Sequence, residues 1–552
     1  MAHYPPLLAT PKETPENKYA NKKPPHYYYK VSGIEPYTGP WNEETSKHLL
    51  RRCLFGFTKD QIETVKNMGL SNAVDAMLSN HNSYAAPIND YNDNYSDPNI
   101  NPGEEWVSQG YNPDPTLNNL RNRSFQNWWF GEMVEQPMSI QEKLTLFWHN
   151  HFATQISTVN FAHFSYGTNQ LLRSNSLGNF KDLVKAITLD PGMLLYLNGY
   201  KNRKFKPDEN YARELQELFT LGKGDASQYT EDDVKEAARI LTGWTFDQNA
   251  EVVYFSNLHD TGDKQFSSFY NNQVIKGNVD ANVELDQLID MIFSQEECAK
   301  YIIRKLYRFF VYYVIDDEIE SKVITPLSQT LVLNNFEIKP VLDQLFKSAH
   351  FFDPYTKGAI IKNPMDFLIG HFKAVNFDGR RSNLIERSQG FSVMNLLSEI
   401  LQMTIGEPPN VAGWSAYHQS PQYHEHWINS VTLPKRNQIA DVVMIRPNGL
   451  RIAGINTFID VIALSETVPG VNDPNLLIDY WVDLLYTKGL TQDQKDTLKS
   501  ILLYGQSEDY YWTVAWEDYQ ANKQDQQKLL TVYYILYGFY KQLFNYPEYQ
   551  LS

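Results

Sequence analysis

Cysteine is scarce in this chain of 552 residues, which contains only Cys53 and Cys298. The two lie far apart and neither belongs to a CxxC pair, so the sequence excludes a disulfide framework and a cysteine-based zinc site. A single bridge between the two remains open. Cys298 falls in a helical pattern beside Tyr301 and Ile302, and this setting favours a buried free thiol.

The sequence also lacks clusters of positively charged residues and long apolar runs. The net charge is −16 and no block of Lys and Arg occurs, which argues against nucleic acid or anionic lipid as a partner. No stretch approaches the roughly 20 apolar residues of a membrane span, and the first residues lack the apolar segment of a secretory signal. We therefore expect a soluble protein, either cytoplasmic or matured by a cleavage that this sequence does not show.

The motifs of several common enzyme classes are missing too. The sequence has no Walker A motif, no GxGxxG after a strand, no GxSxG elbow, no kinase signature and no EF-hand loop. We expect no nucleotide cofactor. Aromatic residues are abundant at 14%, and such residues suit both wet cores and surfaces that bind sugars or peptides.

Hydrophobic periodicity predicts a mainly α, multi-helix globular protein with a minor β-hairpin excursion near residues 250–275. We divide the chain into an extended N-terminal arm (1–44), a helical core domain (45–435) and a C-terminal helical extension packed on it (436–552). A long segment rich in Asn, Pro and Tyr covers residues 80–118, and loops of that length are usually functional or mobile. Capping-box pairs predict four helix starts, at Ser139/Glu142, Thr230/Asp233, Ser294/Glu297 and Thr491/Gln494.

The helix predicted at 207–221 carries the first candidate site. Its apolar stripe leaves Asn210, Glu214 and Glu217 on one adjoining strip, because spacings of three and four share a helix face. Glu214 points toward the apolar side and needs a partner there, whereas Arg213 lies on the outer side. Two carboxylates on one strip can hold a divalent metal or raise one pKa for acid/base catalysis. A solvated helix edge with intrahelical pairs is the alternative.

Two histidines form the second candidate, on the helix predicted at 140–153. His149 and His151 are two positions apart, so a regular helix cannot aim both at one metal ion, unlike the HExxH arrangement. His151 lies in the apolar stripe and must find a hydrogen-bond partner. We interpret it either as a satisfied core histidine or as a metal ligand or general base that meets Glu214 across a helix packing.

Two loops supply further candidates. His259, Asp260 and Lys264 follow a predicted strand in the segment HDTGDKQF. This segment is either a functional loop or an ordinary turn. Trp414 and His418 lie in an aromatic loop that also contains His424 and His426. These residues could form the rim of a sugar-stacking or metal-binding site; the alternative is a loop that is simply packed through its aromatic side chains. We add Trp244 and Asn210 as candidate substrate contacts.

Seven segments resemble one family when they are taken together and in order. The resemblance spans about residues 45–435 and rests on HLLRRCLFGFT (48–58), EKLTLFWHNHFAT (142–154), DPGMLLYLNG (190–199), NYARELQELFTLGKG (210–224), YTEDDVKEAARILTGW (229–244), HDTGDKQF (259–266) and PPNVAGW (408–414). These are typical of the bacterial family 1800 of the domains of unknown function. The resemblance implies an exported protein, although this sequence shows no signal, and it implies an alkaline-phosphatase- or sulfatase-like neighbour as a partner. It implies no catalytic residues.

Two classes of function remain open. The first is a hydrolase acting on a glycan or other extracellular polymer, either metal-assisted through Glu214, Glu217 and His151 or through carboxylate acid/base chemistry. Arg213 or Lys264 would hold an anionic group, and Glu214, a histidine of 149 or 151, and His259 should then share one pocket. The second is a non-catalytic binding or assembly protein that contacts a partner protein or polysaccharide through aromatic residues, and it should expose an aromatic patch.

Overall fold

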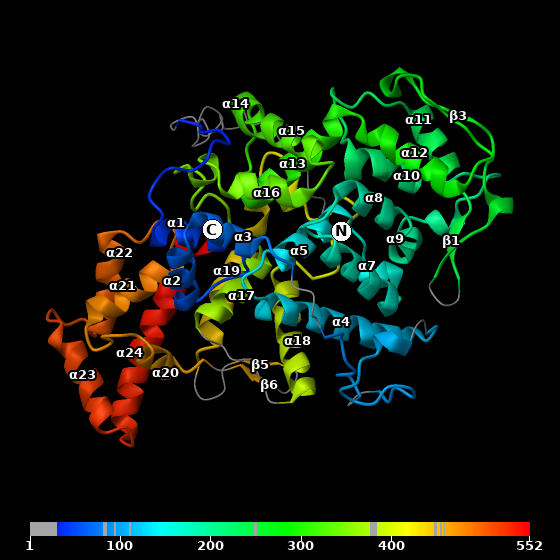
Figure 1. The fold of residues 1–552 in the computed structure, drawn as a ribbon. Helices are drawn as coiled ribbons and strands as arrows, with labels where there is room; N and C mark the ends of the chain where they lie inside the picture. Colours follow the sequence, from blue (N-terminus) through cyan, green and yellow to red (C-terminus); the bar gives the residue numbers. More distant parts are fainter. Residues whose placement is uncertain are drawn as a thin grey trace, which may run out of the picture.

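Helices dominate the computed structural model, as the sequence predicts (Figure 1). The structure describes residues 30–80, 85–92, 95–109, 112–247, 251–375, 383–445, 450–452, 455–457 and 459–552. Residues 1–29 of the predicted arm and parts of the predicted 80–118 loop therefore lie outside the described residues. Residues 30–42 contact the body of this same chain, where Ser32 donates hydrogen bonds to Asp353 and Gly33 accepts one from His350.

Helices are the main elements of the first part of the body. They are α1 (Glu43–Cys53), α2 (Lys59–Met68), α3 (Leu70–Met77), α4 (Pro115–Glu135), α5 (Gln141–His151), α6 (Ile156–Val159), α7 (Ala162–Ser174), α8 (Phe180–Thr188) and α9 (Pro191–Tyr196).

The middle of the chain adds two small hairpins to the helices. The hairpin strands pair antiparallel as β1 (Trp244–Phe246) with β2 (Val252–Tyr254) and β3 (Lys264–Gln265) with β4 (Val274–Ile275), so the predicted excursion at 250–275 is confirmed. The helices here are α10 (Asn210–Glu214), the π-helical η4 (Leu215–Thr220), α11 (Glu231–Ile240), α12 (Ala281–Phe293), α13 (Glu296–Phe310), α14 (Asp317–Ile319), the π-helical η7 (Glu320–Ile324), α15 (Thr325–Leu333) and α16 (Ile338–Phe346).

The last part of the chain contains one further hairpin that the sequence did not predict, β5 (Leu450–Ile452) with β6 (Ile455–Thr457). Its helices are α17 (Pro364–Ala374), α18 (Leu384–Ile400), α19 (Thr432–Val442), α20 (Val461–Glu466), α21 (Pro474–Leu485), α22 (Gln492–Leu502), α23 (Tyr510–Ala521) and α24 (Gln526–Asn545). Helices α20 and α23 were also missed; Asp460 caps the start of α20, whereas α23 begins without a side-chain cap.

Capping chemistry explains where several helices begin. Thr230 with Asp233 and Thr491 with Gln494 form the predicted reciprocal boxes. The other two predicted boxes are wrong, because in each an ion pair with an arginine takes the acidic residue. Glu142 forms a buried pair with Arg173, and Glu297 pairs with Arg304; accordingly α5 and α13 begin without a side-chain cap.

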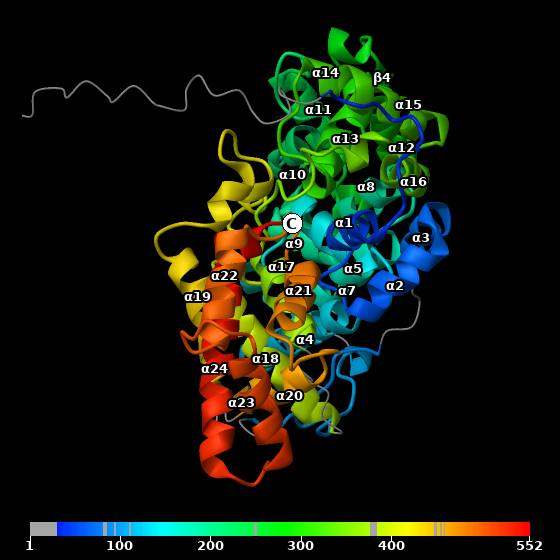
Figure 2. The same cartoon turned by 90° about the vertical axis from the view of Figure 1, so that its left-hand side faces the viewer.

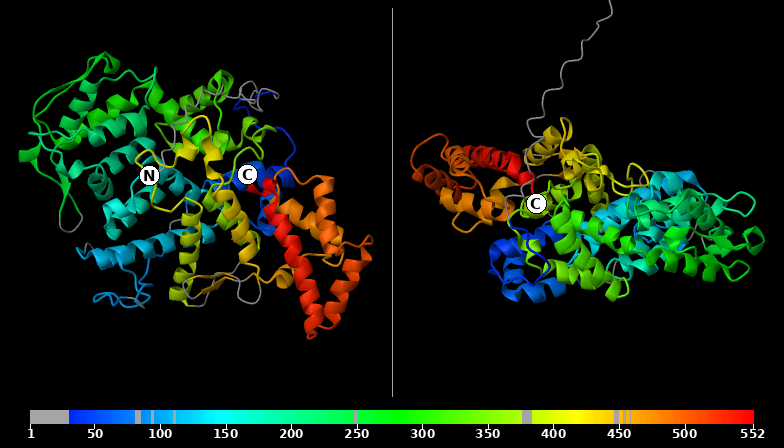
Figure 3. Two further views of the ribbon diagram at one scale, coloured as in Figure 1. Left: turned by 180° about the vertical axis from the view of Figure 1, so that it is seen from behind. Right: turned by 90° about the horizontal axis from the view of Figure 1, so that it is seen from above.

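One hydrophobic core runs through the body and into the C-terminal helices. It includes large buried side chains such as Trp129 and Trp148 and extends to Trp481 and Trp512. Helices α20 to α24 pack at one end of the molecule, whereas α11, α12 and the β3–β4 hairpin lie at the other (Figures 1, 2 and 3). The chain end returns to the middle, where Lys362 donates its backbone N–H to the carbonyl of Gln550.

Candidate functional site

A π-helical segment replaces the second half of the helix predicted at 207–221. Helix α10 begins at Asn210 rather than at Pro207, and η4 follows it from Leu215 to Thr220. The backbone N–H of Leu221 donates to Gln216 O, five residues back. The wider π winding and the helix end leave the carbonyls of Leu218 and Phe219 free for side chains. π segments occur often at functional sites.

His151 and Lys305 reach these carbonyls from two other helices. The His151 Nε2 lies 3.0 Å from Phe219 O. The Lys305 Nζ lies 3.1 Å from both Leu218 O and the His151 Nδ1. Both contacts are consistent with one tautomer, in which Nε2 donates to the carbonyl and Nδ1 accepts from the amine. His151 thus has its hydrogen-bond partners, but its partner is a lysine and not Glu214.

The Lys305 amine is held in an environment that favours its neutral form. Burial, helped by the charge of Arg308, lowers the pKa of Lys305 to about 7. Burial and the charge of Lys305 together keep the pKa of His151 well below its usual value, so the imidazole stays neutral. A lysine with such a pKa can act as a base near neutral pH.

Glu214 is half-buried and makes no hydrogen bond or ion pair with any residue that the structure describes. Burial first, and the negative charge of Glu217 second, raise the pKa of Glu214. Both effects favour its protonated form. The expectation that Glu214 needs a partner on the apolar side is therefore not met by a direct polar contact, and the carboxyl is left available for a ligand.

The neighbours of Glu214 on the same helix have ordinary structural partners. Arg213 forms ion pairs with Glu209 and, at 2.7 Å, with Glu231. Glu217 pairs with Lys223 at 3.4 Å, and the Asn210 side chain donates to Leu197 O at 3.3 Å. Arg213 is thus engaged outward, as its predicted position on the helix implies.

Three half-buried tyrosines lie within electrostatic range of Glu214. The negative charge of Glu214 adds to the burial that raises the pKa values of Tyr196, Tyr229 and Tyr301. The Tyr301 hydroxyl donates to Leu218 O at 2.9 Å, and Lys305 Nζ lies 4.8 Å from the centre of the same ring. We call Glu214, these three tyrosines and Lys305 the Glu214 face.

His149 and the 405–427 loop meet on the other side of α5. The His149 ring packs edge-on against Trp129 and lies 6.2 Å from the Trp414 ring, and burial lowers its pKa to about 4. The Trp414 backbone N–H donates to Asn150 at 2.8 Å. The pKa of His418 is lowered by partial burial first and by the charge of Lys305 second. The structure therefore brings His149 and Trp414 together and places His418 within electrostatic range of Lys305.

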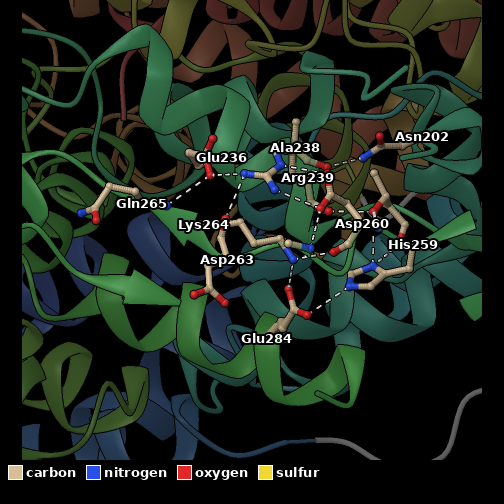
Figure 4. Close-up of polar contacts among 12 residues, drawn as sticks. Asn202, Glu236, Ala238, Arg239, His259, Asp260, Asp263, Lys264, Gln265 and Glu284 are labelled. Carbon is tan, nitrogen blue, oxygen red and sulfur yellow. Dashed lines mark hydrogen bonds and ion pairs between the residues drawn. The ribbon is translucent and has the colours of Figure 1, made fainter. Parts of the chain in front are cut away.

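His259 and Lys264 form a separate, closed cluster (Figure 4). Both reach Glu284 of α12, with His259 Nε2 at 3.1 Å and Lys264 in a short ion pair, and Lys264 also donates to Asp260 O at 2.6 Å. His259 Nδ1 lies 2.9 Å from the carbonyl of Thr242. The side chains of His259, Lys264 and Glu284 are at most 1% exposed. The cluster is a satisfied core network and does not join Glu214 in one pocket, contrary to the expectation.

Trp244 also has a structural setting. It begins β1, is 7% exposed, and its ring lies 4.9 Å from that of Tyr254. It belongs to a small second hydrophobic cluster with Leu194 and Ala281, so packing explains its burial.

The structure contradicts the predicted metal site formed by Glu214, Glu217 and His151. Within the part of the chain that the structure describes, no group of three His, Cys, Asp or Glu side chains is arranged to hold a metal ion. The physical reason is that both His151 nitrogens are already engaged, one with Phe219 O and the other with Lys305. Both cysteines are buried and free, as Cys298 was expected to be.

Sequence reasoning missed Lys305, although a signal exists. Lys305 lies between Tyr301 and Phe309 at spacings of four, so it interrupts an aromatic stripe of α13. A lysine in such a stripe is half-buried and its pKa is open to perturbation.

Comparison with protein families gives one result. The family described as "Protein of unknown function (DUF1800)" matches residues 48–551. The chain belongs to this family. The match extends past the 45–435 range of the sequence resemblance and includes the C-terminal helices of this DUF1800 member. No curated protein and no solved structure matches. No helix among the described residues is long and apolar enough to cross a membrane.

Proposed function

We propose that the chain is a hydrolase that cleaves a glycan or another extracellular polymer at the Glu214 face. The observation that carries the proposal is a half-buried carboxyl with a raised pKa and no polar partner among the described residues, with three tyrosines within its electrostatic range. Active sites place titratable groups with shifted pKa values in such settings. Tyrosine rings with hydroxyls suit the mixed apolar and polar faces of sugars.

The pKa values of two groups on this face are shifted in opposite directions. The pKa of Glu214 is raised, and the pKa of Lys305 is lowered to about 7. Protonated Glu214 would donate its proton to the leaving oxygen as the bond to that oxygen breaks. Neutral Lys305 would take a proton from the attacking water as the new carbon–oxygen bond forms. Glu217 acts through its charge, which keeps Glu214 protonated to a higher pH.

A hydrolysis assay with matched variants tests the proposal. The purified chain is incubated with a panel of polysaccharides, and new reducing ends are measured. Glu214→Gln cannot donate a proton and should lose activity by 100-fold or more, in line with the roughly 10²–10⁴-fold contribution of a general acid. Glu209→Gln, one turn earlier and ion-paired with Arg213, is the control and should retain activity. Equal activity of Glu214→Gln and the parent would refute the proposal.

A second function is favoured by a different surface. Helices α23 and α24 form a hairpin at one end of the molecule (Figure 2). Several of its aromatic and apolar side chains are exposed, namely Tyr510, Tyr511, Val514, Leu530 and Tyr534. Because the two helices are antiparallel and in contact, Val514 and Tyr534 lie at similar distances from the turn. Such a patch suits an assembly protein that contacts a partner protein, such as the alkaline-phosphatase- or sulfatase-like neighbour that the resemblance implies, or a polysaccharide.

Sedimentation analysis separates this alternative from the first. If the patch mediates assembly or polysaccharide binding, Val514→Ser/Tyr534→Ser should abolish self-association or retention on the polysaccharide. A monomer that binds no polysaccharide, before and after the substitution, would argue against the assembly function.

A further inference from the structure

Positively charged side chains gather around a cavity in the middle of this acidic protein. Its walls come from the ends of α1, α5, α13 and α17 and from the 415–427 loop, and it holds about 540 Å³ of space, part of it continuous with solvent. Arg51, Arg52, Lys143 and Arg308 line it, whereas Asp366 is the only acidic side chain in the lining.

Asp366 does not balance these charges. Its carboxylate already accepts a close ion pair from Lys143 and a 2.8 Å hydrogen bond from Asn363. Arg51 and Arg52 reach only backbone carbonyls, those of Leu484 and Thr356. Arg51 and Arg52 are only 9% and 4% exposed. Together with Arg308, three arginines line the cavity, and none of them forms an ion pair with a carboxylate among the described residues.

Several polar nitrogens at this cavity have no hydrogen-bond partner in the described structure. They include the Nε atoms of Arg52 and Arg308 and the Nε2 of His424, all buried. The Arg308 guanidinium lies 5.4 Å from the centre of the Tyr423 ring and makes no ion pair within the described residues. Ser552 lies at the same wall, with its backbone N–H turned to Ile360 O.

Leaving such charges buried without a counter-charge is costly. Burial lowers the pKa values of Arg51 and Arg52 to about 10. The positive charge continues into an adjoining cavity of about 490 Å³, which Arg51 shares with Lys362, whose pKa falls to about 7. An anion in the first cavity would lie against Arg51 and Arg52, with Lys362 in the adjoining cavity.

We propose that this cavity binds a tetrahedral oxyanion, a phosphate or a sulfate, either as the free ion or as the ester group of a larger ligand. A guanidinium group can donate two parallel hydrogen bonds to a pair of phosphate or sulfate oxygens. A tetrahedral oxyanion has more oxygens than a carboxylate, so it can accept from several of these side chains at once. The assignment does not rest on the proposed hydrolase, because the cavity and the Glu214 face share no residue; the two are linked only through the charge of Arg308, which also helps lower the pKa of Lys305.

Anion titrations of the full chain test the site. Thermal unfolding and calorimetry are run at pH 7.5 with sodium phosphate or sodium sulfate against sodium chloride at equal ionic strength. A bound anion should raise the unfolding temperature saturably, because it binds only the folded state. Glucose 6-phosphate and N-acetylglucosamine 6-sulfate serve as ester probes. Tighter binding of an ester assigns the site to a larger ligand, and tighter binding of the ion assigns it to the free anion.

Arg308→Gln is the decisive variant. It should weaken anion binding at least tenfold and, because it removes an unpaired charge, should raise the unfolding temperature of the anion-free protein. If it does not fold, Arg308→Lys should show the same weakening, since it keeps the charge but loses the fork. Lys300→Gln, on the same helix and paired with Glu296, should bind as the parent does. A response to phosphate and sulfate no larger than to chloride, or undiminished binding by the Arg308 variant, would overturn the proposal.

Discussion

Removal of the Lys264 amine should open the α11–α12 region without removing a catalytic group. Lys264 makes two contacts at full burial, a close ion pair with Glu284 and a 2.6 Å hydrogen bond to Asp260 O. Lys264→Met leaves the Glu284 carboxylate buried with only His259 beside it. Breaking a buried pair on one side costs about 3–5 kcal/mol. The substitution should therefore lower the free energy of local opening of this region, because different parts of a protein open with different free energies.

Hydrogen exchange of backbone amides in residues 231–293 measures this opening directly. A loss of about 3–5 kcal/mol corresponds to exchange that is roughly 150- to 4000-fold faster, at a factor of ten per 1.4 kcal/mol. The matched control is Lys276→Met on the neighbouring loop, whose pair with Asp263 is 71% and 52% exposed and is therefore screened by solvent, so its loss should leave exchange nearly unchanged.

A second variant separates the charge from the packing. Lys264→Met/Glu284→Leu removes both charges, so it should recover much of the protection and leave the unpartnered His259 nitrogen at a cost of about 1–3 kcal/mol. If Lys264→Met changes exchange less than tenfold, or if it abolishes hydrolysis while exchange is unchanged, the interpretation of this cluster as a structural network is refuted.

Two further predictions concern α5 and the loop that packs on it. His149 is protonated in the unfolded chain below its usual pKa of 6.5 but in the folded protein only near 4, so unfolding takes up a proton between these pH values and stability falls as pH falls through this window. His149→Gln should therefore reduce the acid loss seen in urea midpoints by up to about 1.4 kcal/mol per pH unit; an unchanged slope would show that the imidazole is not buried in its neutral form. Gly413 has a φ of +84°, and a Cβ there would overlap Asn150, so Gly413→Ala should destabilise the protein by about 1–3 kcal/mol and alter the Trp414 fluorescence. A free energy of unfolding within about 0.5 kcal/mol of the parent value, the effect typical of a surface substitution, would contradict this packing.

Local chemistry made part of the fold predictable. The Thr230/Asp233 and Thr491/Gln494 boxes needed only neighbouring residues, and both formed. The Ser139/Glu142 box failed because Arg173, about thirty residues away along the chain, offers Glu142 a buried bidentate pair. That pair can be seen only once the helices are packed.

The candidate site was predictable only where one helix contains it. The half-burial of Glu214 followed from its place beside the apolar stripe, and the structure agrees. The partner of His151 did not follow, because Lys305 lies 154 positions away. The cationic cavity was missed for the same reason. Arg51, Arg52, Lys143 and Arg308 come from three helices, and no spacing in the sequence marks them as neighbours.

The most direct test of the central claim is the pH dependence of polymer hydrolysis by the parent, Glu214→Gln and Lys305→Met. Both titrating groups should shape the parent profile, and the one with a pKa of about 7 belongs to Lys305. We predict that Lys305→Met loses the limb near pH 7 and that Glu214→Gln loses activity at every pH. An active Glu214→Gln with the full profile of the parent would contradict the assignment of this face as the catalytic site.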